Sequence, residues 1–291
     1  MTHWLWRARD LAAQQQGSDL RGGCEKEIRR MNREKDMGHV IWQPQFDVYM
    51  ALVDGSPASI VLDMGAVPHA PVSSHSLRLQ VRVKLLHPRD DGLRDASELE
   101  KMGEIEDTLS RHVSAKLDGI YVGRFTCEGS TTYVFYLPAK QAERAEDLES
   151  IIGDLGPYAW EWLTDDDPEW DYFTSFLYPD AVSLEAMANR QLLANLEKRG
   201  DRLEVSRDVD HLAYFPTREH ATVAAEKLQN LGFRTDDVKR SEDEEHRWVL
   251  EFHRFDSLAN GRPDEFCAEI QNIIRQYKGF YDGWGTVVVS S

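Results

Sequence analysis

The most regular hydrophobic pattern in the chain runs from Ser76 to Leu85, where apolar and polar residues alternate. Alternation with a period of two is typical of a strand that buries one face and exposes the other. The apolar side comprises Leu77, Leu79, Val81, Val83 and Leu85, and the polar side comprises Arg78, Gln80, Arg82 and Lys84. We expect the basic side to be solvated or paired with acidic neighbours.

A hairpin is predicted before this strand and a helix after it. Two strand-like segments, 46–50 and 60–62, flank Asp54-Gly55, a dipeptide that favours tight hairpin turns. Ser97 and Glu100 have the spacing of a capping box, which predicts the start of a helix. Helical spacing is then kept by Leu99, Met102, Ile105, Leu109, Val113 and Leu117.

The next stretch predicts two further strands, a second helix and a final strand. Strands 120–127 and 131–137 turn at Glu128-Gly129-Ser130, and a helix over 139–152 ends at Gly153. The residues expected to point inward from this helix are Ala142, Ala145, Leu148 and Ile152. Tyr158, Trp160 and Trp162 then alternate as a strand. The region is therefore predicted to be α+β, with a mostly antiparallel sheet and two helices.

The last third of the chain predicts a different arrangement. After a helix that begins at Ser183, we expect strand 207–215, helix 217–231, strand 233–239, strand 246–253, helix 263–278 and strand 280–289. Thr217 suits an N-cap, Pro263 a first helical turn and Gly279 a C′ position. The order βαββαβ is that of a ferredoxin-like α+β sandwich. Its two helices should bury Ala221, Ala224, Leu228, Leu231, Phe266, Ile270, Ile273 and Tyr277.

These elements divide the 291 residues into two domains of ordinary size. We place the boundary at Tyr178-Pro179-Asp180, which gives domains at 39–180 and 181–291. Residues 1–38 have no sustained apolar period and are expected to be a disordered tail. A start codon assigned too far upstream is the alternative, because Met37 comes just before the first strand pattern.

The net charge of −17 argues against direct binding of RNA or DNA. Affinity for nucleic acids comes mostly from lysines and arginines that neutralise phosphates, and neither domain has an evident basic groove. Residues 39–180 contain 11 basic and 25 acidic residues, and residues 181–291 contain 15 and 20. An acidic surface instead favours solubility or a basic protein partner.

The cysteines point to a reduced, cytoplasmic protein. Cys24, Cys127 and Cys267 are far apart and form no CxxC pair, so we expect free thiols and no zinc site. No apolar run approaches the length of a membrane span, and the first residues have no secretory signal.

The sequence contains none of the common catalytic or phosphate-binding motifs, and we expect no catalytic residue, metal or cofactor. His246 and His253 should point to opposite faces of a strand. Glu104, Glu106 and Asp107 lie within one helical turn and are expected to form a solvated helix face. Val249, Glu251 and His253 offer no platform on which RNA bases could stack.

The strongest local signal is the hexapeptide Tyr281-Asp282-Gly283-Trp284-Gly285-Thr286. Physically it requires only a bend and a close approach of backbone to indole, so a terminal strand whose Trp seals the sheet edge would explain it. As a string, however, it resembles the signature of the RraB family, the regulators of ribonuclease E activity. Supporting residues are Arg207, Val209, Asp210, His211, Tyr214, Phe215 and Leu231-Gly232-Phe233. The resemblance covers about residues 183–289.

This resemblance implies a function. Family members are acidic cytoplasmic proteins that bind the endoribonuclease RNase E and modulate RNA cleavage without being enzymes. The residues implied in partner binding are Tyr281, Asp282, Gly283, Trp284, Gly285, Thr286 and His211. The better-known members carry a long acidic tail after the hexapeptide, whereas this chain ends at Ser291, which puts inhibitory potency in doubt.

The first domain resembles the bacterial "domain of unknown function 695", which often precedes an RraB-like domain and implies no activity. The strings that carry the resemblance are residues 53–60, 89–93, 105–107 and 121–126.

Three hypotheses follow, and none fixes the oligomeric state. The third in rank is direct RNA binding, against which the net charge argues. The leading one is a non-catalytic regulator whose partner is an RNase E-type ribonuclease, with no direct contact to nucleic acid or membrane. The alternative is an uncharacterised enzyme or small-ligand-binding protein that acts through the N-terminal domain. Its motivation is the pair of loops at Asp54-Gly55 and Asp90-Asp91-Gly92, which could place carboxylates at the mouth of a pocket.

Overall fold

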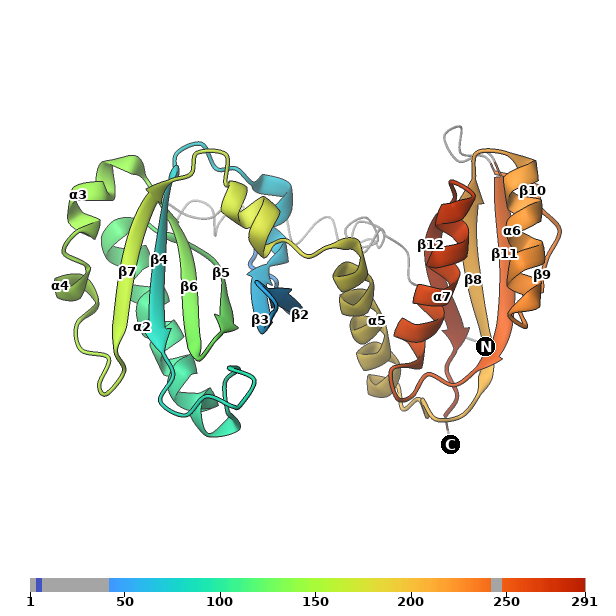
Figure 1. Ribbon diagram of the computed structural model, residues 1–291, viewed down its shortest axis with the longest axis horizontal. Helices are drawn as coiled ribbons and strands as arrows, with labels where there is room; N and C mark the ends of the chain where they lie inside the picture. The colour runs from blue at the N-terminus through green and yellow to red at the C-terminus, as the bar shows by residue number, and fades with distance from the viewer. Residues whose placement is uncertain (1–3, 7–41, 242–247, 291) are drawn as a thin grey trace, which may run out of the picture. The chain divides into compact units, whose positions relative to one another are not determined.

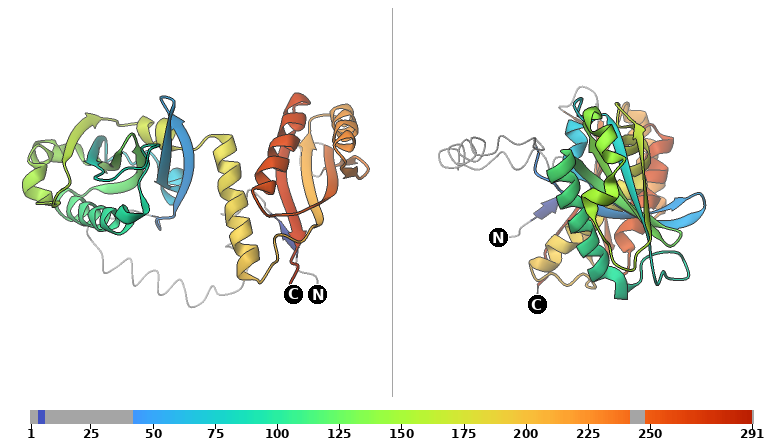
Figure 2. Two further views of the ribbon diagram at one scale, coloured as in Figure 1. Left: turned by 60° about the horizontal axis from the view of Figure 1, so that its bottom comes forward. Right: turned by 90° about the vertical axis from the view of Figure 1, so that its left-hand side faces the viewer.

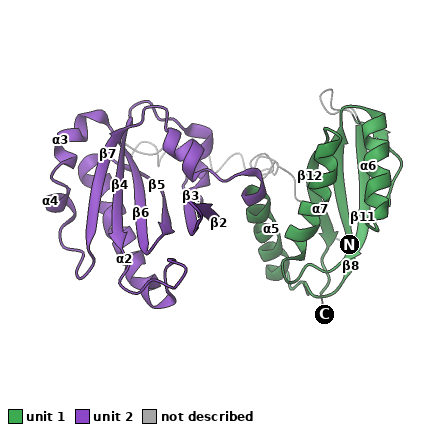
Figure 3. Ribbon diagram, viewed as in Figure 1, with its two compact units in different colours: residues 1–20, 184–291 green, residues 21–183 purple. Residues whose placement is uncertain are grey.

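The computed structural model describes residues 4–6, 42–241 and 248–290, and the chain forms two compact units. Unit 1 contains residues 1–20 and 184–291, and unit 2 contains residues 21–183 (Figure 3). Both units are α+β, as predicted, and each is built on an antiparallel sheet. We refer to unit 2 as the N-terminal domain and to unit 1 as the C-terminal domain.

The N-terminal domain contains a six-stranded antiparallel sheet with the order β2-β3-β5-β6-β4-β7. Its strands are β2 (Phe46–Val53), β3 (Ser56–Asp63), β4 (Leu77–Lys84), β5 (Ile120–Cys127), β6 (Ser130–Leu137) and β7 (Trp160–Asp166). The predicted hairpin is present: Asp54 and Gly55 both have positive φ, which matches the twist of the strands that they join. The alternating strand is β4, and its apolar side is fully packed into the core.

One face of this sheet is covered by α2 (Leu99–Leu117), which lies along the strands in Figures 1 and 2. Met102, Ile105, Leu109, Val113 and Leu117 are buried as the helical spacing predicts, whereas Leu99 is exposed. The predicted capping box is wrong, because Glu98 occupies the N-cap without a side-chain bond. Asp95 instead accepts the Ser97 backbone N–H and caps the preceding turn η3 (Ala96–Glu98).

The second predicted helix of this domain is broken into short pieces. They are η4 (Ala139–Gln141), α3 (Ala142–Ala145) and α4 (Leu148–Ile152). The backbone leaves the helical region at Asp147, whose carboxylate accepts the Ser150 hydroxyl at 2.8 Å, a local bond that competes with helix continuation. Ala142 is exposed, contrary to expectation, while the other three predicted residues reach the core.

Among the described residues, the opposite face of the sheet is covered only in part, by the short segments η2 (Met64–His69) and η5 (Tyr172–Leu177). Trp170 stacks on Tyr136 with ring centroids 4.0 Å apart, and the Tyr136 hydroxyl donates to Asp167 at 2.6 Å. The segment that ends in η5 is thereby fixed over one half of this face, and the other half is left open to the cavity described below.

The C-terminal domain has the predicted βαββαβ order. Its elements are β1 (Trp4–Trp6), α5 (Ala181–Lys198), β8 (Arg207–Phe215), α6 (Arg218–Asn230), β9 (Arg234–Thr235), β10 (Lys239–Arg240), β11 (Trp248–Asp256), α7 (Arg262–Gln276) and β12 (Phe280–Val287). The strand order β12-β8-β11-β10 is that of a ferredoxin-like fold, with β9 also paired to β11 and β1 added beside β12. Trp4–Trp6 lie within the predicted tail, and the rest of that tail is outside the described residues.

The helices α6 and α7 share one face of this sheet and enclose its core (Figure 1). The Thr217 hydroxyl accepts the His220 N–H and caps α6, and Pro263 occupies the first turn of α7, both as predicted. Leu231 is exposed, contrary to the predicted buried face. The predicted strand 233–239 consists of two dipeptide strands, β9 and β10, on either side of an irregular segment.

Candidate functional site

The hexapeptide occupies most of β12, and a β-bulge interrupts its pairing with β8. Tyr281 lies opposite Ala213 and Gly283 opposite Leu212, so Asp282 is the additional residue of the bulge. Gly283 has φ +131°, which a residue with a Cβ rarely adopts. The bulge therefore explains why a glycine is needed at position 283. Asp282 and Gly283 together lie opposite the single residue Leu212.

Trp284 is fully buried and anchors a polar network under the sheet. Its indole N–H donates to the Asn189 side-chain oxygen at 2.8 Å, and the Asn189 amide donates to Asp264 at 2.6 Å. Asn189 comes from α5 and Asp264 from α7, so this one amide joins both helices to β12. Trp284 thus stabilises the core of the domain in this conformation.

His211 is the second buried polar residue of this region. Its Nδ1 lies 2.8 Å from the Tyr281 hydroxyl, and its ring stacks on Phe252 with centroids 5.1 Å apart. Nε2 has no hydrogen-bond partner among the described residues. Burial, together with the nearby charges of Arg254 and His253, lowers the pKa of His211 well below its ordinary value. The imidazole is therefore a neutral part of the core.

The predicted partner-binding residues consequently lie close together, but mostly inside the domain. Tyr281, Gly283, Trp284, Gly285, Thr286 and His211 are all buried, and Asp282 is partly exposed. A role in holding β12 in place agrees with these positions. Direct contact with a partner remains a prediction for Asp282.

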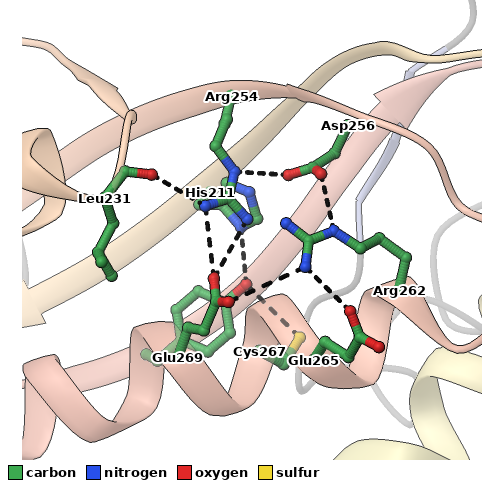
Figure 4. Close-up of polar contacts among 9 residues, drawn as sticks. His211, Leu231, Arg254, Asp256, Arg262, Glu265, Cys267 and Glu269 are labelled. Carbon is green, nitrogen blue, oxygen red and sulfur yellow. Dashed lines mark hydrogen bonds and ion pairs between the residues drawn. The ribbon is translucent and has the colours of Figure 1, made fainter.

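An ionic network near His211 joins β11 to α7 (Figure 4). Asp256 accepts Arg254 Nε at 2.6 Å through one oxygen and Arg262 Nε at 2.9 Å through the other. Glu265 and Glu269 of α7 lie 3.0 and 3.9 Å from Arg262 Nη1, and Glu269 also lies 3.3 Å from Arg254. The arginines and carboxylates of this region are thus paired with one another. The network therefore holds β11 against α7 and is not an open binding site.

The face of the C-terminal sheet opposite α6 and α7 is a surface of which only Val249, Glu251 and His253 were recognised from the sequence, as a side that offers no platform for RNA bases. Strand alternation places on it Asp208, Asp210, Leu212 and Tyr214 of β8 and Val249, Glu251, His253 and Phe255 of β11. Phe255 is 67% exposed, which is unusual for an aromatic side chain on a sheet. We call these eight residues the open face. The alternation of β8 and β11 was the available signal, because their opposite sides carry the core residues.

In the N-terminal domain, the strings that carry its resemblance meet in space. Glu106 accepts both Arg124 Nε and the Tyr121 hydroxyl at 2.7 Å, so it is paired and not solvated as expected. At the other end of the sheet, the Ser56 hydroxyl donates to Glu128 at 3.0 Å, and the Gly129 N–H donates to the Gly92 carbonyl at 2.8 Å. Two loops thus converge on the β5–β6 turn.

A cavity of about 430 Å³ lies on the partly covered face of this sheet. The end of β2 and the turn after it, the strands β4, β5, β6 and β7, and the β5–β6 turn form its wall. The lining residues are Val53, Asp54, Gln80, Arg82, Phe125, Cys127, Glu128, Ser130, Thr132, Glu161, Trp162 and Leu163. Asp54 reaches the cavity, as the alternative hypothesis expected. Asp90 and Asp91 are not part of the lining.

Within the described ranges, no group of three or more His, Cys, Asp or Glu side chains could hold a metal ion. No helix among the described residues is long and apolar enough to cross a membrane. Cys127 and Cys267 are free thiols. His246 lies outside the described residues.

The fold and these sites define a two-domain α+β protein with a ferredoxin-like C-terminal domain. Residues 186–286 match the family described as "Regulator of ribonuclease activity B", and residues 44–178 match a "Family of unknown function (DUF695)". Both resemblances seen in the sequence are thereby confirmed. The chain has no significant match among curated proteins.

Among solved structures, the chain is similar to one described as an unknown protein from Galdieria sulphuraria. The two are 9% identical over 74% of this chain and 99% of the other, with a TM-score of 0.20, and no argument rests on this similarity.

Proposed function

We propose that this chain is a non-catalytic regulator that binds an RNase E-type endoribonuclease and modulates its cleavage of RNA. The observation that supports the proposal most directly is the match of residues 186–286 to Regulator of ribonuclease activity B. The same resemblance implies a cytoplasmic location and a protein partner instead of direct contact with RNA.

The open face is the surface that we assign to this partner. Asp208 and Glu251 carry negative charge on it, with side chains 56% and 50% exposed, and Phe255 adds an exposed aromatic ring. Their ion pairs with Arg234 and Lys239 are exposed and therefore weak, so a basic partner could compete for these carboxylates. Aromatic residues are common anchors in protein interfaces, and complementary charge speeds association.

The hexapeptide holds the strand β12 in the sheet that carries the open face. Trp284 and Tyr281 pack into the core on the helix side of β12. Asp282 is partly exposed, and it precedes Gly283, the residue paired with Leu212 of the open face. Asp282 therefore belongs with the contact residues, whereas Trp284 acts as a structural residue.

The test is cleavage of a short RNA by the purified host ribonuclease, titrated with this protein. We expect slowed cleavage, an association rate that falls with added salt, and a loss of affinity of about tenfold in Phe255→Ala. Asp282→Asn should weaken binding with the fold retained, as circular dichroism would show. Glu226→Gln removes an exposed acid from α6 and should bind like the original protein.

Absence of both binding and slowed cleavage at tens of micromolar protein would overturn the regulator proposal. Equal weakening by Phe255→Ala and Glu226→Gln would instead reject the open face as the contact surface.

A further inference from the structure

The cavity of the N-terminal domain lies outside the surface assigned to the ribonuclease. Most of its lining residues are cross-strand neighbours, and they form rows across the sheet face that is opposite α2. One row is Phe125, Thr132, Arg82 and Glu161, which are direct neighbours on β5, β6, β4 and β7. Cys127 and Ser130 form the adjacent pair, and Gln80 and Leu163 lie on the other side. A volume of about 430 Å³ falls within the range of small-molecule sites.

Two hydroxyl groups in the cavity wall make no hydrogen bond within the described part of the chain. Ser130 is 8% and Thr132 is 6% exposed, and neither side chain is hydrogen-bonded to any other described residue. The neighbouring Thr131 differs, because its hydroxyl lies 2.9 Å from that of Thr126. Both residues line the cavity, so their hydroxyl groups can donate and accept hydrogen bonds with a molecule bound there.

The charges around the cavity favour a cation. Three carboxylates belong to the lining, from Asp54, Glu128 and Glu161, against the single guanidinium of Arg82. Arg82 lies 3.9 Å from Glu161, which offsets part of its own charge. The domain as a whole has 25 acidic and 11 basic residues over 39–180, so it attracts cations at long range and repels anions.

The remaining lining is apolar and supplies a place for a hydrocarbon or aromatic group. Val53, Phe125 and Leu163 contribute it, and Phe125 is held by an edge-to-face contact with Phe176 at 5.1 Å. Val53, Asp54 and Phe125 also belong to the strings through which the domain resembles its family.

We propose that this cavity binds a small organic cation, a protonated amine attached to an apolar body. The carboxylates neutralise the ammonium group, Ser130, Thr132 and Gln80 supply hydrogen bonds, and Phe125 with Leu163 packs against the apolar part. The site is one for reversible binding, and no covalent step is involved.

The test uses phenethylamine as the probe on the full chain, with calorimetry and amide NMR shifts as the two readouts. The neutral analogue 2-phenylethanol and the anionic analogue phenylacetate keep the apolar body and change only the charge. We expect saturable binding of the amine, with NMR shifts centred on β4, β5, β6 and β7. The alcohol should bind at least about tenfold more weakly, a difference of about 1.4 kcal/mol, and the anion should not bind.

Substitutions then locate the site. Thr132→Val is isosteric and removes one unpartnered hydroxyl, and Glu161→Gln removes one carboxylate. Each should weaken amine binding about tenfold while the melting temperature stays within the range of the controls. Glu146→Gln, an exposed acid of the same domain outside the lining, should bind as the original protein does.

Equal affinity for the three probes, or unchanged amine affinity in both Thr132→Val and Glu161→Gln, would overturn the proposal. The ribonuclease assay is independent of this outcome, because these substitutions lie outside the C-terminal domain and should leave inhibition unchanged.

Discussion

At the scale of single residues, His211 makes the C-terminal domain sensitive to acid. Its imidazole is enclosed by Phe233, Phe252 and Phe266, and burial is the main cause that lowers its pKa. In the unfolded chain the same group would titrate near its ordinary value of about 6.5. Below that pH the unfolded state therefore takes up a proton that the folded domain does not bind.

We predict that the free energy of unfolding of this domain decreases as the pH falls below about 6.5. The contribution of His211 should approach about 1.4 kcal/mol per pH unit and should vanish above about pH 7.5, where both states are neutral. Urea unfolding followed through the Trp284 indole N–H signal would measure it. The slope should flatten in His211→Phe and persist in His220→Gln; an unchanged slope in His211→Phe would contradict this account.

At the scale of elements, the connection from α7 to β12 depends on one close approach of the backbone. The expected left-handed C′ position is occupied by Lys278, with φ +56°, and not by Gly279, so that prediction was wrong. Gly279 is required for space, because a Cβ there would lie 2.6 Å from Phe215 and 2.8 Å from Ile274.

Gly279→Ala should therefore destabilise the C-terminal domain by about 1–3 kcal/mol, because Phe215 is fully buried and cannot move away freely. Gly103→Ala is the matched comparison. Gly103 lies within α2, and a Cβ added there would meet no neighbouring atom within 4 Å. Alanine is also the better helix former, by up to about 1 kcal/mol. Thermal unfolding should show opposite signs for the two variants, and a neutral Gly279→Ala would refute the packing argument.

The elements differ in how much of them the sequence could predict. β8 has the predicted bounds because its alternation is set by one buried face. β5 also has the predicted bounds, although residues on both of its faces are buried. The bulge at Asp282 depends on pairing between distant strands, which no local pattern contains. The break at Asp147 accompanies the local bond from Ser150, which the helical spacing of the apolar residues does not reveal. The hexapeptide was recognisable as a string, but its burial follows from the α5 contact through Asn189. Of the cavity, the sequence indicated only Asp54. The other lining residues come mainly from four strands that are brought together only in the folded sheet.

At the scale of the whole molecule, the C-terminal domain depends on a helix that precedes its βαββαβ order. Leu192 and Leu196 of α5 belong to the hydrophobic core, and Asn189 bonds to both β12 and α7. We predict that a fragment of residues 181–291 folds alone and gives a well-dispersed amide NMR spectrum.

A shorter fragment that begins at Gly200 should lose this dispersion. It would leave the Trp284 N–H buried without its acceptor and would expose the core that Leu192 and Leu196 cover. A well-folded short fragment would show that α5 is dispensable, and a collapsed long fragment would refute the independence of the domain.

The pairing of β1 with β12 has a mechanical consequence. Trp4 lies opposite Val287 and Trp6 opposite Gly285 in an antiparallel register. The start of β1 and the end of β12, which lead to the two chain termini, are therefore at the same end of the ladder. A force applied to the two ends of the chain would separate the strands one residue pair at a time, beginning at the pair Trp4 and Val287. Because unzipping loads the hydrogen bonds in sequence, release of the three-residue strand should be the first and weakest event in a pulling experiment.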